Sequence, residues 1–145
     1  MGKRVNRRTF CASLLGGSIA TFSIVRADAP VTITDMVGRS VILPRRPKRI
    51  ILLEAIDIIT MALLHPDPAA LIVGWAAVDR LDSDIVRESF MTGHSIETIG
   101  RQSPQSVSVE GIVSLSPDLV VASLHMIPGG ENDQLVQRLR GFGIP

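Results

Sequence analysis

Cysteine is nearly absent from this chain of 145 residues, because Cys11 is the only one. It falls within the first 27 residues, so the rest of the chain can form neither a disulfide nor a thiolate metal site. Aromatic residues are also scarce, at 3%, with one tryptophan and no tyrosine. After residue 27 the aromatic side chains are Trp75, Phe90 and Phe142, so few residues are suited to stack on a flat ligand.

A concentrated basic surface is missing as well. Five of the 15 Lys and Arg residues lie in the first 27 positions, where there is no acidic residue. The ten that remain stand against 14 acidic residues, so the body of the chain is mildly acidic. It offers no basic face for nucleic acid, and we expect no nucleic-acid partner.

The sequence also lacks the motifs of common catalytic sites. Neither Gly-x-Ser-x-Gly nor Gly-x-x-x-x-Gly-Lys occurs, so a nucleophile elbow and a phosphate loop are both missing. His65, His94 and His125 are far apart, without the close His, Asp or Glu spacing of a transition-metal site. We therefore expect a protein that is not an enzyme and holds no metal through its own side chains.

The first 27 residues have the layout of a secretory signal peptide. Basic residues that include Arg7 and Arg8 precede an apolar stretch at 10–25, and small residues end the segment at Ala27. The run 6–10, Asn-Arg-Arg-Thr-Phe, resembles the twin-arginine export signal. A membrane anchor is the alternative, but the apolar stretch contains two glycines and is short for a bilayer core of roughly 30 Å. We therefore expect export by the twin-arginine translocase, cleavage near Ala27 and a periplasmic location.

Short apolar runs alternate with helical periodicity along residues 28–145. Two alternating runs around Gly38 predict a hairpin with strands at 31–34 and 40–43. Further strands are predicted at 49–54, 70–75, 97–100 and 119–123, and residues 143–145 are predicted to begin another. Helices are predicted at 55–64, 82–91, 107–115 and 131–142. The alternation predicts one α/β domain with a parallel sheet.

Candidate binding residues follow from this arrangement, because ligands of open α/β sheets bind beyond the carboxyl ends of the strands. Glu54, Trp75, Ser123 and His125 lie at the ends of predicted strands, and Arg101 begins the polar loop 101–106. Trp75 could stack on a ligand or fill the core. Arg101 could pair with an anionic chelate or be solvated. Ser123 and His125 alone do not make a hydrolase.

Several short motifs follow one another after the leader. In order they are TD-x-x-GR-x-V-x-LP at 34–44, P-x-RI at 47–50, IVG at 72–74, IG at 99–100, VE-x-I at 109–112, L-x-PDLV at 115–120 and GIP at 143–145. Together they resemble the periplasmic substrate-binding proteins of ferric-siderophore, haem and cobalamin ABC importers, whose two lobes are joined by one long helix. The resemblance covers nearly the whole chain after the leader.

This resemblance implies a fold and a function. Residues 28–145 would form the parallel-sheet N-terminal lobe of a two-lobe binding protein, incomplete at its C-terminus, with the second lobe absent from this sequence. The lobe would help to capture a ferric siderophore or a related iron chelate, haem or cobalamin. The glutamate that matches Glu110 would dock on the ABC permease in the inner membrane. Because the ligand arrives as a preassembled chelate, no cofactor is expected.

Other hypotheses remain open. The chain could be a lobe of an exported α/β enzyme that shares only the fold, or a non-functional truncated fragment. It could also be a lobe without a transport function, tethered to the membrane by residues 1–27. The missing catalytic motifs favour the binding protein over the enzyme.

Overall fold

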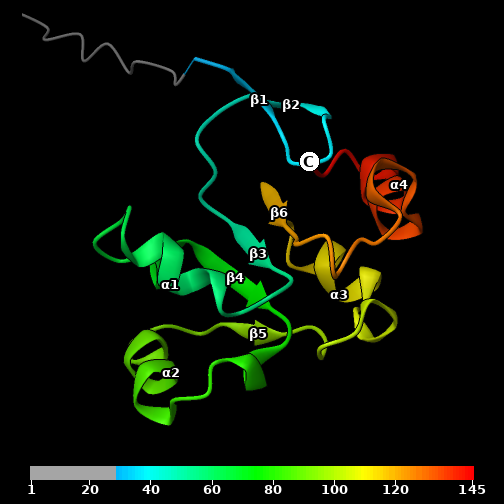
Figure 1. Ribbon diagram of the computed structural model, residues 1–145. Helices are drawn as coiled ribbons and strands as arrows, with labels where there is room; N and C mark the ends of the chain where they lie inside the picture. The colour runs from blue at the N-terminus through cyan, green and yellow to red at the C-terminus, as the bar shows by residue number, and fades with distance from the viewer. Residues whose placement is uncertain (1–28) are drawn as a thin grey trace, which may run out of the picture.

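The computed structural model describes residues 29–145 (Figure 1). These residues form a mixed α/β fold with a four-stranded parallel sheet and a separate two-stranded antiparallel sheet. The predicted signal peptide, with Arg7, Arg8 and the cleavage near Ala27, lies outside the described residues.

The antiparallel sheet is the predicted hairpin, and its bounds are confirmed as β1 (Val31–Thr34) and β2 (Ser40–Leu43). Asp35 holds the turn, because its Oδ1 accepts hydrogen bonds from the backbone N–H groups of Val37 and Arg39 at 3.0 and 2.8 Å. Desolvation acts to raise the pKa of Asp35, but these bonds and the Arg39 guanidinium outweigh it and lower the pKa. Gly38 supplies the positive φ of 83° that closes the reversal.

The parallel sheet contains β3 (Ile50–Leu52), β4 (Ile72–Trp75), β5 (Glu97–Thr98) and β6 (Leu119–Val121). The order across the sheet is β5-β4-β3-β6, so the chain moves outward from β3 to β5 and then returns to the other side of β3. All four strands were predicted, and each is shorter than its predicted range. The reversal of strand order lies between β3 and β6.

Both faces of this sheet are covered, as a parallel sheet requires. Ile50 and Leu52 point to the side covered by α1 (Asp57–Ala62) and α2 (Asp84–Met91). Ile51 and Leu53 point to the other side, covered by α3 (Val109–Ser114) and α4 (Gln134–Gly141). The alternation along one strand therefore divides the core into two halves, one on each face.

Within residues 29–145, four short 3₁₀ helices accompany the α-helices, and the first three lie outside the predicted helices. They are η1 (Ala69–Leu71), η2 (Val78–Arg80), η3 (Pro104–Ser106) and η4 (Gly130–Asn132). The prediction of one helix over 131–142 is wrong, because Asp133 adopts an extended conformation between η4 and α4. Its Oδ1 accepts a hydrogen bond from Leu135 N at 2.9 Å, so Asp133 starts α4 as an N-cap.

The last residues return to the sheet. The carbonyl oxygen of Pro145 accepts a hydrogen bond from Val120 N at 3.0 Å, on the edge of β6 that does not face β3. No strand is assigned at 143–145, where Gly143 has a positive φ of 70°, so the predicted start of another strand is limited to this single bond.

Candidate functional site

The candidate site is the edge of the sheet at which its parallel strands end. Hydrogen bonds extend the strand pairing past the assigned ends, from Leu53 N to Val121 O and from Ala55 N to Ala76 O, both 2.9 Å. The residues after β3, β4 and β6 are thereby held side by side. Open α/β sheets bind ligands at this edge, where the strand order reverses. Here the reversal places Glu54 after β3 and Ser123 after β6 as neighbours across the sheet.

Glu54 occupies the centre of this edge. It is the only charged residue in the buried core of residues 29–145, with 6% of its surface exposed. Its Oε1 forms an ion pair with Nη1 of Arg80, whose side chain is 44% exposed. Burying a carboxylate without a partner costs free energy, so Arg80 supplies the positive charge that the buried Glu54 requires. Glu54 therefore faces inward, and its partner reaches the surface.

Arg80 reaches Glu54 because the chain turns sharply after β4. Ala77 has a left-handed backbone, with φ of 51°, which is uncommon for a residue with a Cβ. The turn directs η2 back across the edge of the sheet, and Ala77 itself is fully buried. A strained residue of this kind persists where the surrounding structure holds it in place.

Asp57, in the first turn of α1, adds a second carboxylate beside this pair. Desolvation by burial raises the pKa of Asp57, and the charge of Glu54 raises it further, against the opposing effect of Arg80. Arg80 therefore acts electrostatically on both carboxylates, while its ion pair within residues 29–145 is with Glu54.

Gln102 connects the polar loop 101–106 to the two neighbouring segments. Its side-chain Nε2 donates a hydrogen bond to Oδ2 of Asp79 in η2, at 2.8 Å. Its carbonyl oxygen lies 3.3 Å from Nε2 of His125, in the segment after β6. Arg101 N donates to Ser106 Oγ at 2.8 Å, which closes the loop on itself. Three loops at one edge are thus joined through a single residue.

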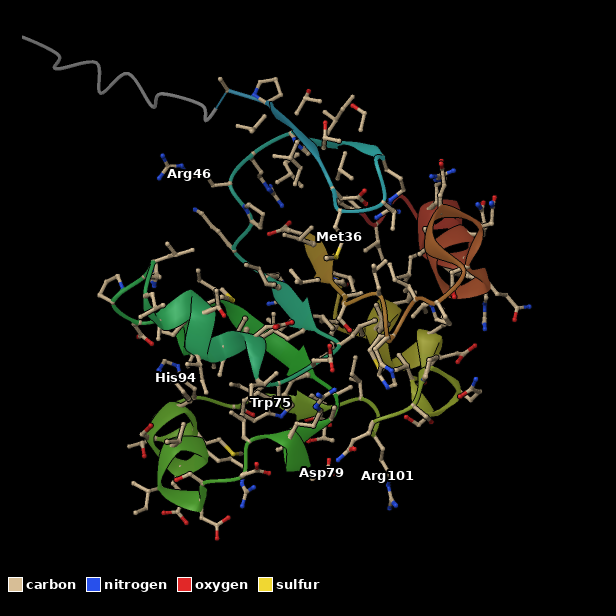
Figure 2. All side chains as sticks on the ribbon, in the orientation of Figure 1. Met36, Arg46, Trp75, Asp79, His94 and Arg101 are labelled. Carbon is tan, nitrogen blue, oxygen red and sulfur yellow. The ribbon has the colours of Figure 1, made fainter. Side chains whose placement is uncertain are left out.

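Arg101 and His125, both predicted as binding residues, are exposed at this edge. Figure 2 shows Asp79 and Arg101 on the same border of the molecule, with Arg101 directed outward. Among residues 29–145, no ion-pair partner contacts Arg101. Its guanidinium is available to a ligand.

Trp75 and Ser123, the other two predicted residues, lie deeper. Only 1% of the Trp75 surface is exposed, and it packs in the core half that faces α1 and α2 (Figure 2). Its burial supports the interpretation of Trp75 as a core residue. Ser123 is half-buried at the end of β6, and its buried Oγ has no hydrogen-bond partner in the described part of the chain.

The arginine of this site was missed by the sequence analysis. No prediction covered 76–81, the segment that contains η2. A signal was present, because a glutamate at the end of a buried strand requires a cation. Arg80 is the first basic residue after β4 and therefore the natural candidate.

Glu110 lies away from this edge, in the first turn of α3, and its side chain is 79% exposed. Its own backbone N–H and the nearby Arg138, with Nη2 at 2.9 Å, lower the pKa of Glu110. Ion pairs at the surface contribute little to stability, so another arginine could replace Arg138 as its partner.

A cavity of about 430 Å³ forms an apolar groove between the hairpin, β6 and α4. It is lined by such residues as Ile33, Val120, Leu139 and Pro145. Asp35, Arg39, Ser40 and Arg140 also border it; Asp35 and Arg39 are bonded to each other, and Arg140 pairs with Glu131. The groove lies along the edge of β6 and lacks the convergent free polar groups that fix a ligand in place, so we assign the site to the carboxyl edge.

In the part of the chain that the structure covers, no three or more His, Cys, Asp or Glu side chains are grouped so that they could hold a metal ion. No helix within 29–145 is both long and apolar enough to cross a membrane. The chain matches no protein-family model and no curated protein.

Proposed function

We propose that this chain is the N-terminal lobe of an exported substrate-binding protein that captures a ferric siderophore or a related iron chelate, haem or cobalamin for an ABC importer. The observation that carries the proposal is the set of polar groups at the reversal of strand order. Glu54 with Arg80, the loop of Arg101, Ser123 and His125 all lie at the edge where open α/β sheets bind ligands.

The same residues favour binding over catalysis. A serine nucleophile needs a base within hydrogen-bond reach. Within residues 29–145, Ser123 Oγ has no hydrogen-bond partner, and Nε2 of His125 contacts the carbonyl of Gln102. The two residues that a hydrolase could have used are therefore not paired. This supports a receptor rather than the alternative of an exported enzyme lobe.

The rest of the fold is compatible with delivery to a permease. Glu110 is exposed on α3, on the face of the sheet covered by α3 and α4, and its ion pair with Arg138 is exchangeable. Docking would exchange Arg138 for arginines of the permease, while the ligand occupies the separate carboxyl edge.

Binding of iron chelates is the experiment that tests this proposal. The chain without residues 1–27 is titrated calorimetrically with ferric citrate, a ferric hydroxamate, a ferric catecholate, haem and cobalamin. We expect at least one of them to bind with a Kd of roughly 10 μM to 1 mM, because the described residues supply one side of a site and exclude water incompletely. If none binds at concentrations up to about 1 mM, the proposal is wrong.

Export has its own test, because the proposal places the protein in the periplasm. Replacing Arg7 and Arg8 with lysine should hold the precursor in the cytoplasm, measured by fractionation and immunoblotting. An unchanged periplasmic yield of this variant would rule out the twin-arginine route.

A further inference from the structure

One face of the hairpin is apolar and incompletely covered. The register of β1 and β2 pairs Val31 with Leu43 and, two residues along, Ile33 with Val41. Paired side chains of an antiparallel sheet lie on the same face. Val31 and Ile33 on this face are nevertheless 51% and 41% exposed. Because a two-stranded sheet is only marginally stable by itself, its apolar face needs a further surface to pack against.

This face and the turn of the hairpin border the apolar groove. Ile33 and Val41 line it from the hairpin, residues 119–122 line it from β6 and the segment that follows, and α4 contributes Leu139 among others. Met36, in the turn, also lines the groove and is 71% exposed. Figure 2 shows Met36 between the hairpin and β6. One surface thus combines a hollow of about 430 Å³ with exposed apolar side chains at its margin.

The charges around the groove are balanced within the chain itself. Asp35 and Arg39 are bonded to each other at 2.6 Å, and Arg140 pairs with Glu131 at 3.1 Å. A strongly charged partner would therefore meet no excess of opposite charge there. A second copy of the chain carries the same balanced pairs, so two such surfaces are not driven apart by net charge.

The groove also has the extent of a protein interface. About twenty residues line it, and a standard interface involves about 20–30 residues on each side. A contact between identical chains across a two-fold axis uses the same surface twice, so that surface must supply both the hollow and the part that fills it. The groove and the hairpin together meet this condition.

We propose that two copies of this chain form a two-fold dimer through the apolar groove, with the turn and the apolar face of each hairpin lying in the groove of the other copy. The contact buries Ile33 and Met36, which are exposed in a single copy. Glu54, Arg80 and His125 do not line the groove. The inference therefore goes beyond the proposed receptor function and does not depend on it.

Sedimentation velocity tests the dimer. We expect the chain without residues 1–27 to be in monomer–dimer equilibrium with a Kd of roughly 1–100 μM, the weak end of the range for interfaces of this size. Nothing larger should form, because a two-fold contact closes on itself. A monomer at all concentrations up to about 500 μM, or growth beyond a dimer, would refute the proposal. The full chain is measured beside it, since association of the full chain alone would assign the contact to residues 1–27 and also refute it.

Two lysine variants test the location of the contact. Ile33→Lys and Met36→Lys each bring a charge into the interface twice per dimer, and each should raise the Kd at least about a hundredfold. The matched controls are Ile59→Lys on α1 and Met91→Lys at the end of α2, on the other face of the sheet. Ile59 and Met91 are 44% and 42% exposed, close to Ile33. Each control should change the Kd by less than about threefold.

A folding defect is kept apart from a loss of contact. Circular dichroism and melting curves show whether each variant is folded. Met36 is more exposed than Ile33, so Met36→Lys decides the question if Ile33→Lys does not fold. The groove is not the interface if folded Met36→Lys dimerises as tightly as Met91→Lys.

NMR identifies the occupant of the groove. When the ¹⁵N-labelled chain without residues 1–27 is diluted from about 500 to 10 μM, shift changes should concentrate at 33–42, 119–122 and 135–145. Shift changes at the exposed Leu63 and Leu64 instead would place the contact on α1 and refute the proposal. A chain that stays monomeric and binds anilinonaphthalene sulfonate in the groove would show that the occupant is a small apolar molecule, which also refutes the dimer. The chelate titrations test the receptor function independently of each of these results.

Discussion

Replacing Arg80 with methionine should destabilise the fold, because it removes the partner of a buried carboxylate. Methionine preserves length and packing but offers no donor to Glu54, of which 6% is exposed. Breaking a fully buried ion pair costs about 3–5 kcal/mol, and leaving a single buried acceptor unsatisfied costs about 1–3 kcal/mol. Since the Arg80 side chain is 44% exposed, we place the cost at about 2 kcal/mol. For a domain of this size, the melting temperature should fall by about 6–12 °C.

The assay is urea denaturation at neutral pH, followed by the fluorescence of Trp75, the only tryptophan. Its burial in the core makes it a direct reporter of unfolding. Arg87→Met is the control, because Arg87 pairs with Asp84 at the surface of α2 and its loss should cost less than about 0.5 kcal/mol.

A double variant isolates the interaction itself. Glu54→Gln with Arg80→Met leaves a neutral buried side chain and should recover more than half of the lost stability. The reasoning is wrong if Arg80→Met costs no more than Arg87→Met, or if the double variant is as unstable as Arg80→Met alone.

Three further predictions concern other residues. The pKa of Asp57 is raised in the folded state, so its negative charge opposes folding above that pKa. Asp57→Asn should therefore raise the melting temperature at pH 7, and this gain should vanish as the pH falls through the folded pKa. An equal gain in melting temperature at all pH values would contradict this cause. Gly74→Ala should lower the free energy of unfolding, measured by urea denaturation, by about 1–3 kcal/mol, because the added Cβ would lie 2.7 Å from Leu115 Cδ1. An unchanged free energy of unfolding would show that Leu115 moves freely. Glu110→Lys should reduce chelate uptake in cells that carry the cognate permease, because like charges would repel, while the chelate affinity is unchanged; normal uptake at limiting ligand would exclude Glu110 from docking.

Much of the fold could be predicted because the strands have clear patterns. The hairpin 31–34 and 40–43 was predicted to the residue, since alternation and Gly38 define both strands and turn. Residues 50–53 are apolar throughout because β3 is central, with Ile50 to Leu52 buried on both faces. Its pairing length could not be predicted, because an apolar run continues past the last ladder bond.

The start of helix α4 depends on a capping side chain, which the spacing of apolar residues does not predict. The apolar positions of 131–142 begin at Leu135 and do not mark where the helix starts, whereas the side chain of Asp133 bonds to Leu135 N and its backbone is extended there. Asp133 is a suitable N-cap, so a capping rule would have divided the segment. Periodicity alone favoured one helix.

The candidate site could be predicted as a region but not as a set of contacts. The rule that ligands bind beyond strand ends selected Glu54, Ser123 and His125, which the structure brings to one edge. The ion pair of Glu54 with Arg80 depends on the left-handed turn at Ala77, and an alanine in the sequence does not predict such a turn. Two interpretations of Trp75 were equally open because burial depends on tertiary packing.

The most direct test of this account is to locate the ligand by NMR. The chain without residues 1–27, labelled with ¹⁵N, is titrated with gallium(III) citrate, a diamagnetic substitute for the ferric complex. We predict that shift changes concentrate at 79–80, 101–102 and 123–125, while the apolar groove along β6 and the surface of α3 around Glu110 stay unchanged. Shift changes confined to the groove, or none at saturating chelate, would contradict the assignment of the ligand site to the carboxyl edge.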